Sequence, residues 1–332
     1  MRVDIEEIKK WNEKIEEKVR EFKLDVYPQE FEIIGYKEML SNEAYIGMPS
    51  KYPHWSYGKA YDKKKSLYDV NIIGLPYEIV INSNPCLAYL MRENNMTLQI
   101  LTMAHVYGHN DFFKNNRMFK DYTVAEDVVS MFKRNADIIR GYVEDINIGY
   151  EKVERVLDAA HGMRFQIALD GEEDIFEYLI RKSNLKDYEK NILRIVKKES
   201  LYFMPQIETK IMNEGWASFW HYKILKSLNL DFKNYIEFLK NHNQVVAPMI
   251  GGINPYYVGF KIFMDIEKRF GIEKAFEARA LERDSSFLRK YLTKELVNSL
   301  NLYKFTKKSF EFMVEEVGDE EGYKEIIKEF SN

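Results

Sequence analysis

The residues best suited to chemistry are two histidines in the stretch MAHVYGHNDFF, residues 103–113. His105 and His109 have the four-residue spacing of the zinc-binding histidines in the His-Glu-x-x-His helix of metalloproteases. On a helix, this spacing places both imidazoles on one face about one turn apart, where they can bind one metal ion. Val106, however, occupies the position of the catalytic glutamate. The pair alone also fits two core histidines satisfied by hydrogen bonds, so a third ligand is needed to identify a metal site.

The best candidate for the third ligand is Glu214 in IMNEGWASFW. It is a carboxylate inside an apolar helical stretch, where an unpaired glutamate would be costly, although an ordinary buried ion pair would also satisfy it. His221 lies seven residues further on, on the same helix face, and could be a ligand or could support one. Gly108 removes a side chain between the two histidines and would let another element approach closely.

A second group of candidates lies in ERVLDAAHG, where His161 shares a helix face with Glu154 and Asp158. This group could support the metal ligands, form a second metal site or be a solvated helix face, and we favour the first and the last of these interpretations. His54 and His242 lie in loop-like segments and carry little weight alone. The sequence contains no glycine-rich phosphate loop, no Gly-x-Ser-x-Gly elbow and no Cys-x-x-Cys pair.

Composition narrows the class of protein. The 332 residues are 45% hydrophobic, which is ample for a large core in one domain or in two interleaved ones. With 49 basic and 53 acidic residues the net charge is −4, so electrostatics give no case for nucleic acid or a membrane surface. Cys86 is the only cysteine, the charged N-terminal stretch has no apolar signal core, and no apolar run is long enough to span a bilayer. We therefore expect a cytoplasmic protein in which Cys86 is a buried, inert thiol.

Helical periodicity dominates the chain, and proline and glycine breakers are few. Residues 4–23 predict a helix capped by Asp4, with an apolar face formed by Ile5, Ile8, Ile15, Val19 and Phe22. Residues 77–82 predict a strand, because they contain a β-branched run bounded by turn residues. From residue 86 onward the pattern is helical, with a break expected near Pro205 and a helix that starts after Pro255 and ends at Gly271.

These elements predict an α+β fold that is mostly α with a small β-sheet. We expect one domain over residues 1–332, in which residues 1–85 supply the N-terminal helix and the sheet, and residues 86–332 supply the helical region with the metal site. No repeat and no linker divides the chain.

Several long stretches between residues 27 and 305 are unusual enough to indicate a family: YPQEFEIIGYKEML, YPHWSYGKAY, YEIVINSNPCLAYLM, MAHVYGHNDFFKNN, ERVLDAAHG, NEGWASFWHYKIL, HNQVVAP, INPYYVGFKIFMDIE and SFLRKYLTKELV. In these stretches the chain resembles the stage V sporulation protein R (SpoVR) family. The resemblance implies an association with formation of the spore cortex, the peptidoglycan layer of bacterial spores. Typical members of the family continue past the end of this chain, so we expect their C-terminal part to be absent here.

The order of YEIVINSNP, HVYGH, NEGWASF and INPYYVGF is also similar to that of helical glutamate-zincins. Those proteins have an edge strand, a His-Glu-x-x-His helix, a Glu-Gly-Trp-Ala-type helix that gives the third ligand, and a late Pro-x-x-Tyr-x-x-Gly-type helix. The resemblance implies a zincin-like helical fold that holds one divalent metal, zinc or iron, at His105, His109 and Glu214.

The same resemblance suggests roles for residues around the metal. Tyr256 or Tyr257 would steady an oxyanion, and Asp111 or Glu208 could replace the base that is missing at Val106. An edge strand would border a cleft over the metal and could pair with an extended peptide, through Ile79, Ile81 and Asn82.

Three functions remain open at this point. The ordered motifs favour a metal-dependent hydrolase that acts on a peptide or a peptidoglycan precursor. Val106 favours a non-catalytic regulatory or binding protein on the same scaffold. The abundance of His and carboxylate groups would suit a helical non-haem iron protein, although the Glu-x-x-His pairs of the ferritin type are absent. Its ligands would be His105, His109, Glu214, Asp158 and His161.

Overall fold

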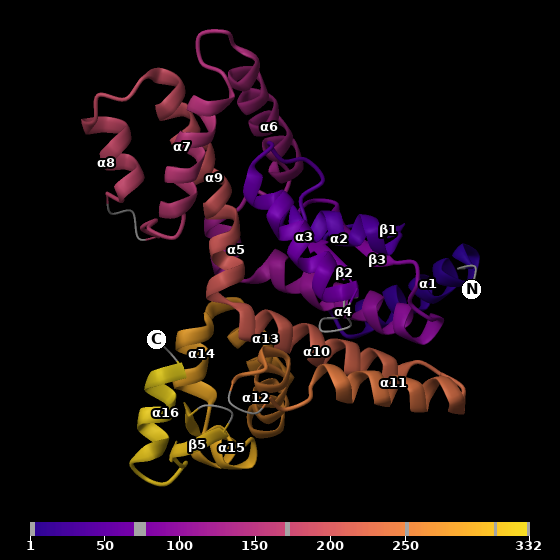
Figure 1. The fold of residues 1–332 in the computed structure, drawn as a ribbon. Helices are drawn as coiled ribbons and strands as arrows, with labels where there is room; N and C mark the ends of the chain where they lie inside the picture. Colours follow the sequence, from indigo (N-terminus) through magenta and orange to yellow (C-terminus); the bar gives the residue numbers. More distant parts are fainter. Residues whose placement is uncertain (1–3, 70–77, 170–172, 250–251, 309–310, 331–332) are drawn as a thin grey trace. The chain divides into compact units, whose positions relative to one another are not determined.

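The computed structural model describes residues 4–69, 78–169, 173–249, 252–308 and 311–330. The protein is mostly helical with small sheets, as the sequence predicts (Figure 1). The described residues form two compact units, and the chain passes from unit 1 to unit 2 and back twice. Unit 1 comprises the described residues of Met1–Gln29, Glu93–Asp121 and Gln206–Asn332, and unit 2 those of Glu30–Arg92 and Tyr122–Pro205. The single-domain description with parts 1–85 and 86–332 remains a prediction.

Most of unit 1 is helical. Its elements are α1 (Ile5–Glu21), α4 (Met96–Asn115), α5 (Arg117–Tyr122, all but its last residue), α10 (Lys210–Ser227), α11 (Phe232–Val245), α12 (Pro255–Phe270), α13 (Ile272–Leu281), α14 (Asp284–Tyr291), α15 (Lys294–Ser299), β4 (Lys304–Lys308), β5 (Glu311–Glu316) and α16 (Gly322–Phe330). Strands β4 and β5 pair antiparallel.

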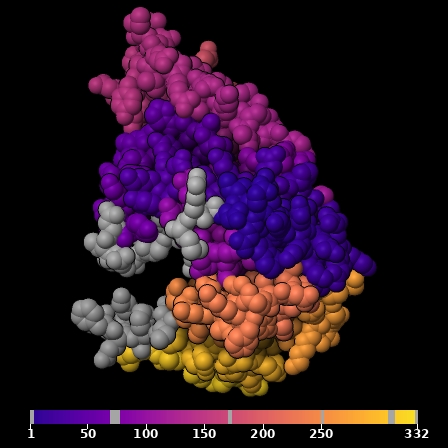
Figure 2. Space-filling view, turned by 90° about the vertical axis from the view of Figure 1, so that its right-hand side faces the viewer, coloured from indigo at the N-terminus to yellow at the C-terminus, as the bar shows by residue number. Residues whose placement is uncertain are grey.

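Helix α4 is the central element of unit 1. Residues 100–113 are buried around its whole circumference, so neighbouring elements must cover it on every side. Helices α1, α10 and α11 contact it, and α12 packs in turn against α10 (Figure 1). Figure 2 shows α11, coloured orange, at the outer surface of this unit. Phe232 and Ile236 on this helix are exposed.

Glycines allow close contact between these helices. A Cβ built on Gly108 would lie 2.6 Å from the Cα of Ala217, so α4 and α10 meet backbone to backbone. A Cβ built on Gly215 would lie 2.4 Å from the Cα of Gly259, so α10 and α12 do the same. The prediction that Gly108 lets another element approach closely is therefore confirmed, and that element is α10.

Unit 2 combines a three-stranded sheet with helices. Its elements are β1 (Gln29–Ile34, all but its first residue), α2 (Tyr36–Ala44), α3 (Trp55–Asp69), β2 (Glu78–Ile81), β3 (Cys86–Met91), α6 (Val128–Glu144), α7 (Tyr150–Met163), α8 (Ile175–Lys182) and α9 (Asp187–Glu208, as far as Pro205). The strand order is β1-β3-β2, and β2 pairs antiparallel with β3 so that Glu78 lies opposite Leu90. Among the strands that the structure describes, β2 is therefore an edge strand of this sheet, as expected.

Helix ends follow the expected chemistry. The Asp4 carboxylate accepts hydrogen bonds from the backbone N–H groups of Glu6 and Glu7, so it caps α1 as predicted. Helix α12 begins at Pro255 and ends before Gly271, which adopts a φ of 85° that favours glycine.

Three expectations need correction. Cys86–Met91 is strand β3 and not part of a helix, because a short apolar run fits either element and its pairing with neighbouring strands decides. Ile5 does not belong to the buried face of α1, since it is exposed in the first turn. Pro205 itself lies inside α9, and the break expected near it occurs at Thr209, between the end of α9 at Glu208 and the start of α10 at Lys210. Tyr77, the first residue of the expected strand, lies outside the described residues.

Candidate metal centre

The three predicted ligands come together within unit 1. Helix α4 carries His105 and His109, whose ring centroids lie 4.6 Å apart and each of which has a ligand nitrogen within 4.8 Å of one on the other. Helix α10 carries Glu214, whose Oε2 lies 3.4 Å from Nε2 of His109 and 3.7 Å from Nε2 of His105. Both histidines are buried, and the Glu214 side chain is 16% exposed, although its Oε2 is buried.

These separations fit a shared metal ion better than hydrogen bonds. A good N–H···O hydrogen bond has an N···O distance of about 2.7–3.2 Å. Ligand atoms that each bind one zinc ion at about 2.0–2.2 Å, in a tetrahedral arrangement, are roughly 3.3–3.6 Å apart. Oε2 of Glu214 also has no hydrogen-bond partner among the described residues. Two imidazoles and one carboxylate are a donor set that divalent metals prefer.

Asn213, which the sequence did not single out, fixes the tautomer of His109. Nδ1 of His109 lies 2.8 Å from Oδ1 of Asn213. An amide oxygen only accepts hydrogen bonds, so Nδ1 carries the proton and Nε2 carries a lone pair. In the neutral ring that lone pair faces the Glu214 oxygen at 3.4 Å, and a cation bound between the two acceptors would satisfy both.

The electrostatics of the centre suit metal binding. Burial lowers the pKa of His105 to about 4, so this imidazole is neutral near pH 7. Burial acts to raise the pKa of Glu214, but His105 and His109 outweigh it and hold this pKa below the ordinary value of a carboxyl group. Neutral imidazole and ionised carboxylate are the forms that coordinate a metal.

Two further histidines extend the centre away from Glu214. Nδ1 of His221, on α10, lies 2.9 Å from Nδ1 of His105, which is the ring nitrogen opposite the one that faces Glu214. Nδ1 of His242, on α11, lies 2.7 Å from Nε2 of His221. This geometry favours His221 as a support for a ligand. His242 received little weight from the sequence because it was expected in a loop-like segment, and this expectation was wrong, since the residue lies on helix α11.

The two tyrosines that the sequence left as alternatives have different surroundings. The ring of Tyr256 stacks on that of His105, with centroids 5.9 Å apart and an interplanar angle of 23°. Tyr257 instead lines a hollow with Asn254, Val258 and residues 300–305 of the C-terminal segment. Tyr256 is therefore the better placed of the two to contact a group bound beside His105.

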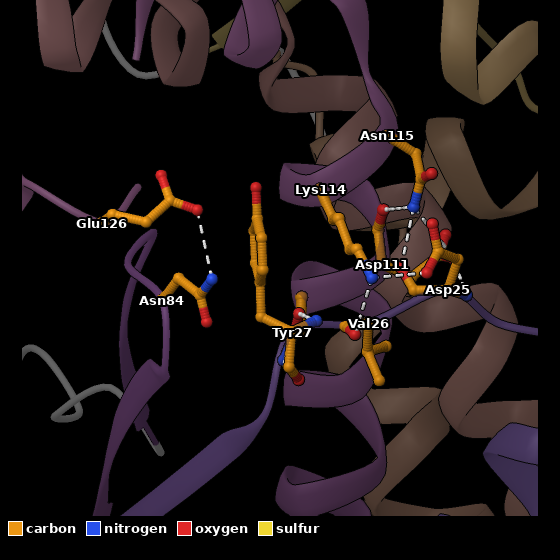
Figure 3. Close-up of polar contacts among 9 residues, drawn as sticks. Asp25, Val26, Tyr27, Asn84, Asp111, Lys114, Asn115 and Glu126 are labelled. Carbon is orange, nitrogen blue, oxygen red and sulfur yellow. Dashed lines mark hydrogen bonds and ion pairs between the residues drawn. The ribbon is translucent and has the colours of Figure 1, made fainter. Parts of the chain in front are cut away.

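Asp111 serves the framework of unit 1. Its Oδ1 accepts a hydrogen bond from the backbone N–H of Asp25 at 2.8 Å, and its Oδ2 accepts one from the indole N–H of Trp216 at 2.8 Å. Oδ2 also lies 3.3 Å from Nε of Arg279, and this ion pair is buried. Figure 3 shows Asp25 and Asp111 together with Lys114, which binds the Asp25 carboxylate at 2.5 Å. The carboxylate thus ties α4 to α10, α13 and the segment after α1.

We expect Asp111→Asn to lower the free energy of unfolding by about 2–3 kcal/mol, because it leaves the buried Arg279 guanidinium without its counter-charge. Metal bound per folded chain should not change, since Asp111 is satisfied elsewhere. Urea unfolding and metal analysis of the folded fraction would check both points. A loss of metal at unchanged stability would instead assign Asp111 to the metal. Glu208, the other candidate base, forms an ion pair with Arg283 at 3.3 Å.

His161 and Asp158 have partners within unit 2. Nε2 of His161 lies 2.8 Å from the hydroxyl oxygen of Tyr52. The Asp158 carboxylate accepts a hydrogen bond from the indole N–H of Trp55 at 2.7 Å and lies 3.2 Å from Nε2 of His54. The expectation that His161 and Asp158 support or replace metal ligands remains a prediction.

The residues of the expected cleft strand also lie in unit 2. Ile79 and Ile81 lie on β2, and Asn82 follows it. The backbone N–H of Asn82 donates to the hydroxyl of Tyr202 at 3.1 Å. That this strand borders a cleft over the metal remains a prediction. Cys86 is fully buried, and burial raises the pKa of its thiol, as expected for an inert cysteine.

The fold and the site thus describe a mostly helical protein with a buried cluster of two histidines and one glutamate. Sequence comparison identifies the family. The chain matches the family described as "SpoVR like protein" over residues 2–170 and 165–332. It belongs to the SpoVR family. It is 33% identical over 397 residues to "Uncharacterized protein YcgB" of Escherichia coli (strain K12), an alignment that covers 94% of this chain and 77% of the relative. No solved structure matches the chain. Among the described residues, no helix has the length and apolar character needed to cross a bilayer.

Proposed function

We propose that this SpoVR protein binds one divalent metal ion, zinc in preference to iron, through His105, His109 and Glu214 on a zincin-like scaffold. The observation that carries this proposal is the pair of facing acceptors, Nε2 of His109 and Oε2 of Glu214, at 3.4 Å. Bound there, the metal would polarise a carbonyl group and lower the pKa of a water molecule.

We further propose that the protein is a cytoplasmic hydrolase that acts on a peptide or a peptidoglycan precursor during formation of the spore cortex. Two histidines and a glutamate are the protein ligands of many hydrolytic zinc sites. Tyr256, stacked on His105, would contact the oxygen on which negative charge develops. The edge of β2 is our candidate for pairing with an extended peptide.

A second function is favoured by Val106, which is fully buried on α4. A valine cannot take a proton, so the protein would keep the metal as part of a regulatory or binding module without catalysis. A two-iron centre has less support, because His161 and Asp158 already have hydrogen-bonding partners in unit 2.

We expect one zinc per chain in protein purified without an affinity tag or added metal. His105→Ala, His109→Ala and Glu214→Gln should each weaken zinc binding by at least about 100-fold and lower thermal stability, because metal binding is linked to folding. Elemental analysis and competition with a chelator give these quantities. His161→Ala is the matched control, and it should leave zinc content unchanged. Two irons per chain that are lost in His161→Ala would support the two-iron alternative.

Hydrolysis is tested separately from metal binding. Zinc-loaded protein should release fragments from peptidoglycan precursors or from short peptides, and mass spectrometry would identify the cleaved bond. Glu214→Gln should abolish this activity. Metal-loaded protein that cleaves neither class of substrate would favour the non-catalytic function.

A further inference from the structure

The start of helix α10, which carries Glu214, is capped by a side chain from another helix of unit 1. Backbone N–H groups in the first turn of a helix have no partner within that helix. In α10, those of Ile211 and Met212 donate to the carboxylate of Asp284, at 2.7 Å to Oδ2 and 2.9 Å to Oδ1. The capping position itself is occupied by Thr209, whose side chain makes no capping hydrogen bond. Asp284, on α14, thus performs the role of the N-cap residue of α10.

Asp284 is itself held in place by the packing of its helix. It lies in the first turn of α14, and this helix contacts α10. Phe287 and Leu288 of α14 are buried, and the ring centroid of Phe287 lies 4.9 Å from that of Phe263 on α12. Helix α12 in turn meets α10 at Gly215. The carboxylate of Asp284 therefore belongs to a helix whose position in unit 1 is fixed by buried apolar side chains.

A second contact from α14 reaches the same part of the chain. Nη1 of Arg283 lies 3.3 Å from Oε2 of Glu208, the last residue of α9. Arg283 and Asp284 therefore contact the chain on both sides of Thr209, the residue that separates α9 from α10. The ion pair of Arg283 is partly exposed to solvent and so contributes little. Hydrogen bonds from backbone N–H groups to an ionised carboxylate are stronger, so Asp284 is the main constraint on the start of α10.

The first turn of α10 leads directly into the groups that form the metal centre. Asn213 follows Met212, and its Oδ1 lies 2.8 Å from Nδ1 of His109. Glu214 comes next, with Oε2 at 3.4 Å from Nε2 of His109. A shift of this turn would move both side chains relative to the histidines of α4. Metal–ligand distances tolerate deviations of only about 0.2 Å, so such a shift would weaken metal binding.

We propose that Asp284 is a positioning residue for the metal centre, which holds the first turn of α10 so that Glu214 and Asn213 face the two histidines of α4. This inference rests on the proposed metal site. The oxygens of Asp284 accept hydrogen bonds from the backbone of α10 and not from the ligands. Its effect on the metal is therefore transmitted through the backbone of α10.

The test compares the binding of zinc and of cobalt(II) by variants of the full chain at pH 8. Burial raises the pKa of Asp284 to about 7, although the two N–H groups act to lower it, so the carboxyl group is mostly ionised at pH 8. Asp284→Ala removes both hydrogen bonds, whereas Asp284→Asn keeps one acceptor oxygen. We expect zinc affinity to fall by about 10–100-fold in Asp284→Ala and by less in Asp284→Asn. The visible spectrum of bound cobalt(II), which reports the arrangement of the ligands, should change in the same order.

Asp231→Ala is the matched control. Asp231 caps α11 by accepting a hydrogen bond from the backbone N–H of Asn234 at 2.9 Å. Its loss also uncaps a helix of unit 1, but one that carries no proposed ligand. Zinc affinity and the cobalt(II) spectrum of this variant should be those of the wild-type protein.

The outcomes separate the inference from the metal site on which it rests. Wild-type zinc affinity and cobalt(II) spectrum in Asp284→Ala would overturn the inference and leave the metal site intact. Equal losses in Asp284→Ala and Asp231→Ala would do the same, because they would assign Asp284 to stability alone. If Asp284→Ala does not fold, the comparison is made with Asp284→Asn, for which wild-type affinity and spectrum would overturn the inference. Absence of zinc uptake by the wild-type protein would overturn both.

Discussion

Gly215→Ala is expected to lower the free energy of unfolding of unit 1 by about 3 kcal/mol or more, and to abolish metal uptake with it. The added Cβ would lie 2.4 Å from the backbone carbonyl carbon and the Cα of Gly259, and 2.8 Å from the backbone nitrogen of Phe260. Backbone atoms inside two packed helices cannot rotate away as a side chain can, so α10 and α12 must separate. Glu214, the adjacent residue on α10, would move with them.

The chain offers matched controls for this substitution. Gly141 in α6 and Gly162 in α7 are also helical, but a Cβ on either would meet nothing within 4 Å. Gly141→Ala should stabilise the protein slightly, because alanine favours a helix interior by about 0.5–1 kcal/mol relative to glycine. Urea unfolding followed by circular dichroism reports on the helices of both units, so it measures both variants. Equal stability of Gly215→Ala and Gly141→Ala would contradict the close packing described here.

Val106→Glu is expected to produce a less stable protein that is no more active than the wild type. Val106 is fully buried one residue after the first ligand, and burying a carboxylate without a partner costs several kcal/mol unless it stays protonated. If the scaffold had merely lost its base, the same substitution would instead restore a carboxylate beside the metal. The expected result follows if the apolar side chain of Val106 excludes water from the site or contacts a group of the substrate.

The pH dependence of the stability of Val106→Glu separates the effect of the introduced charge from the effect of the larger side chain. Burial would raise the folded-state pKa of the introduced carboxyl group above its unfolded value of about 4.3, so the folded protein would bind the proton more tightly. The Val106→Glu variant would therefore lose stability relative to Val106→Gln as the pH rises through and above about 4.3. At lower pH, where the carboxyl group is protonated in both states, the two variants should converge. A stable, zinc-loaded Val106→Glu protein with new peptidase activity would show that the scaffold had lost only its base.

The proposed ligand set was accessible from sequence because it obeys local rules. His105 and His109 are one helical turn apart, and Glu214 is a carboxylate that an apolar helix could not hold without a partner. The sequence could not show which other side chains contact the histidines of the site. Asn213 contacts His109, and His242 contacts His221, through tertiary packing, and no spacing rule connects residue 242 with residue 105.

The fold shows the same division between local and tertiary signals. The Asp4 cap and the end of α12 at Gly271 depend on neighbouring residues, and both were predicted. Strand β3 was predicted as helix because six mostly apolar residues carry too little periodicity to distinguish a buried strand from a helix. The contact of Gly215 with Gly259 joins helices that are distant in sequence, so neither glycine stands out before the structure is known.

The chain passes from unit 1 to unit 2 and back twice, and this order has a consequence for synthesis on the ribosome. Unit 2 is complete once Pro205 has been made, whereas unit 1 still lacks α10 and everything after it. Helix α4, buried around its circumference in the finished protein, therefore emerges with its apolar surface uncovered and waits for more than 90 further residues before α10 is available to cover it. Such an interval exposes hydrophobic surface to aggregation, and chaperones act on chains in this state. His105 and His109 emerge long before Glu214, so the nascent chain can offer a metal only two of the three proposed ligands until residue 214 has been made.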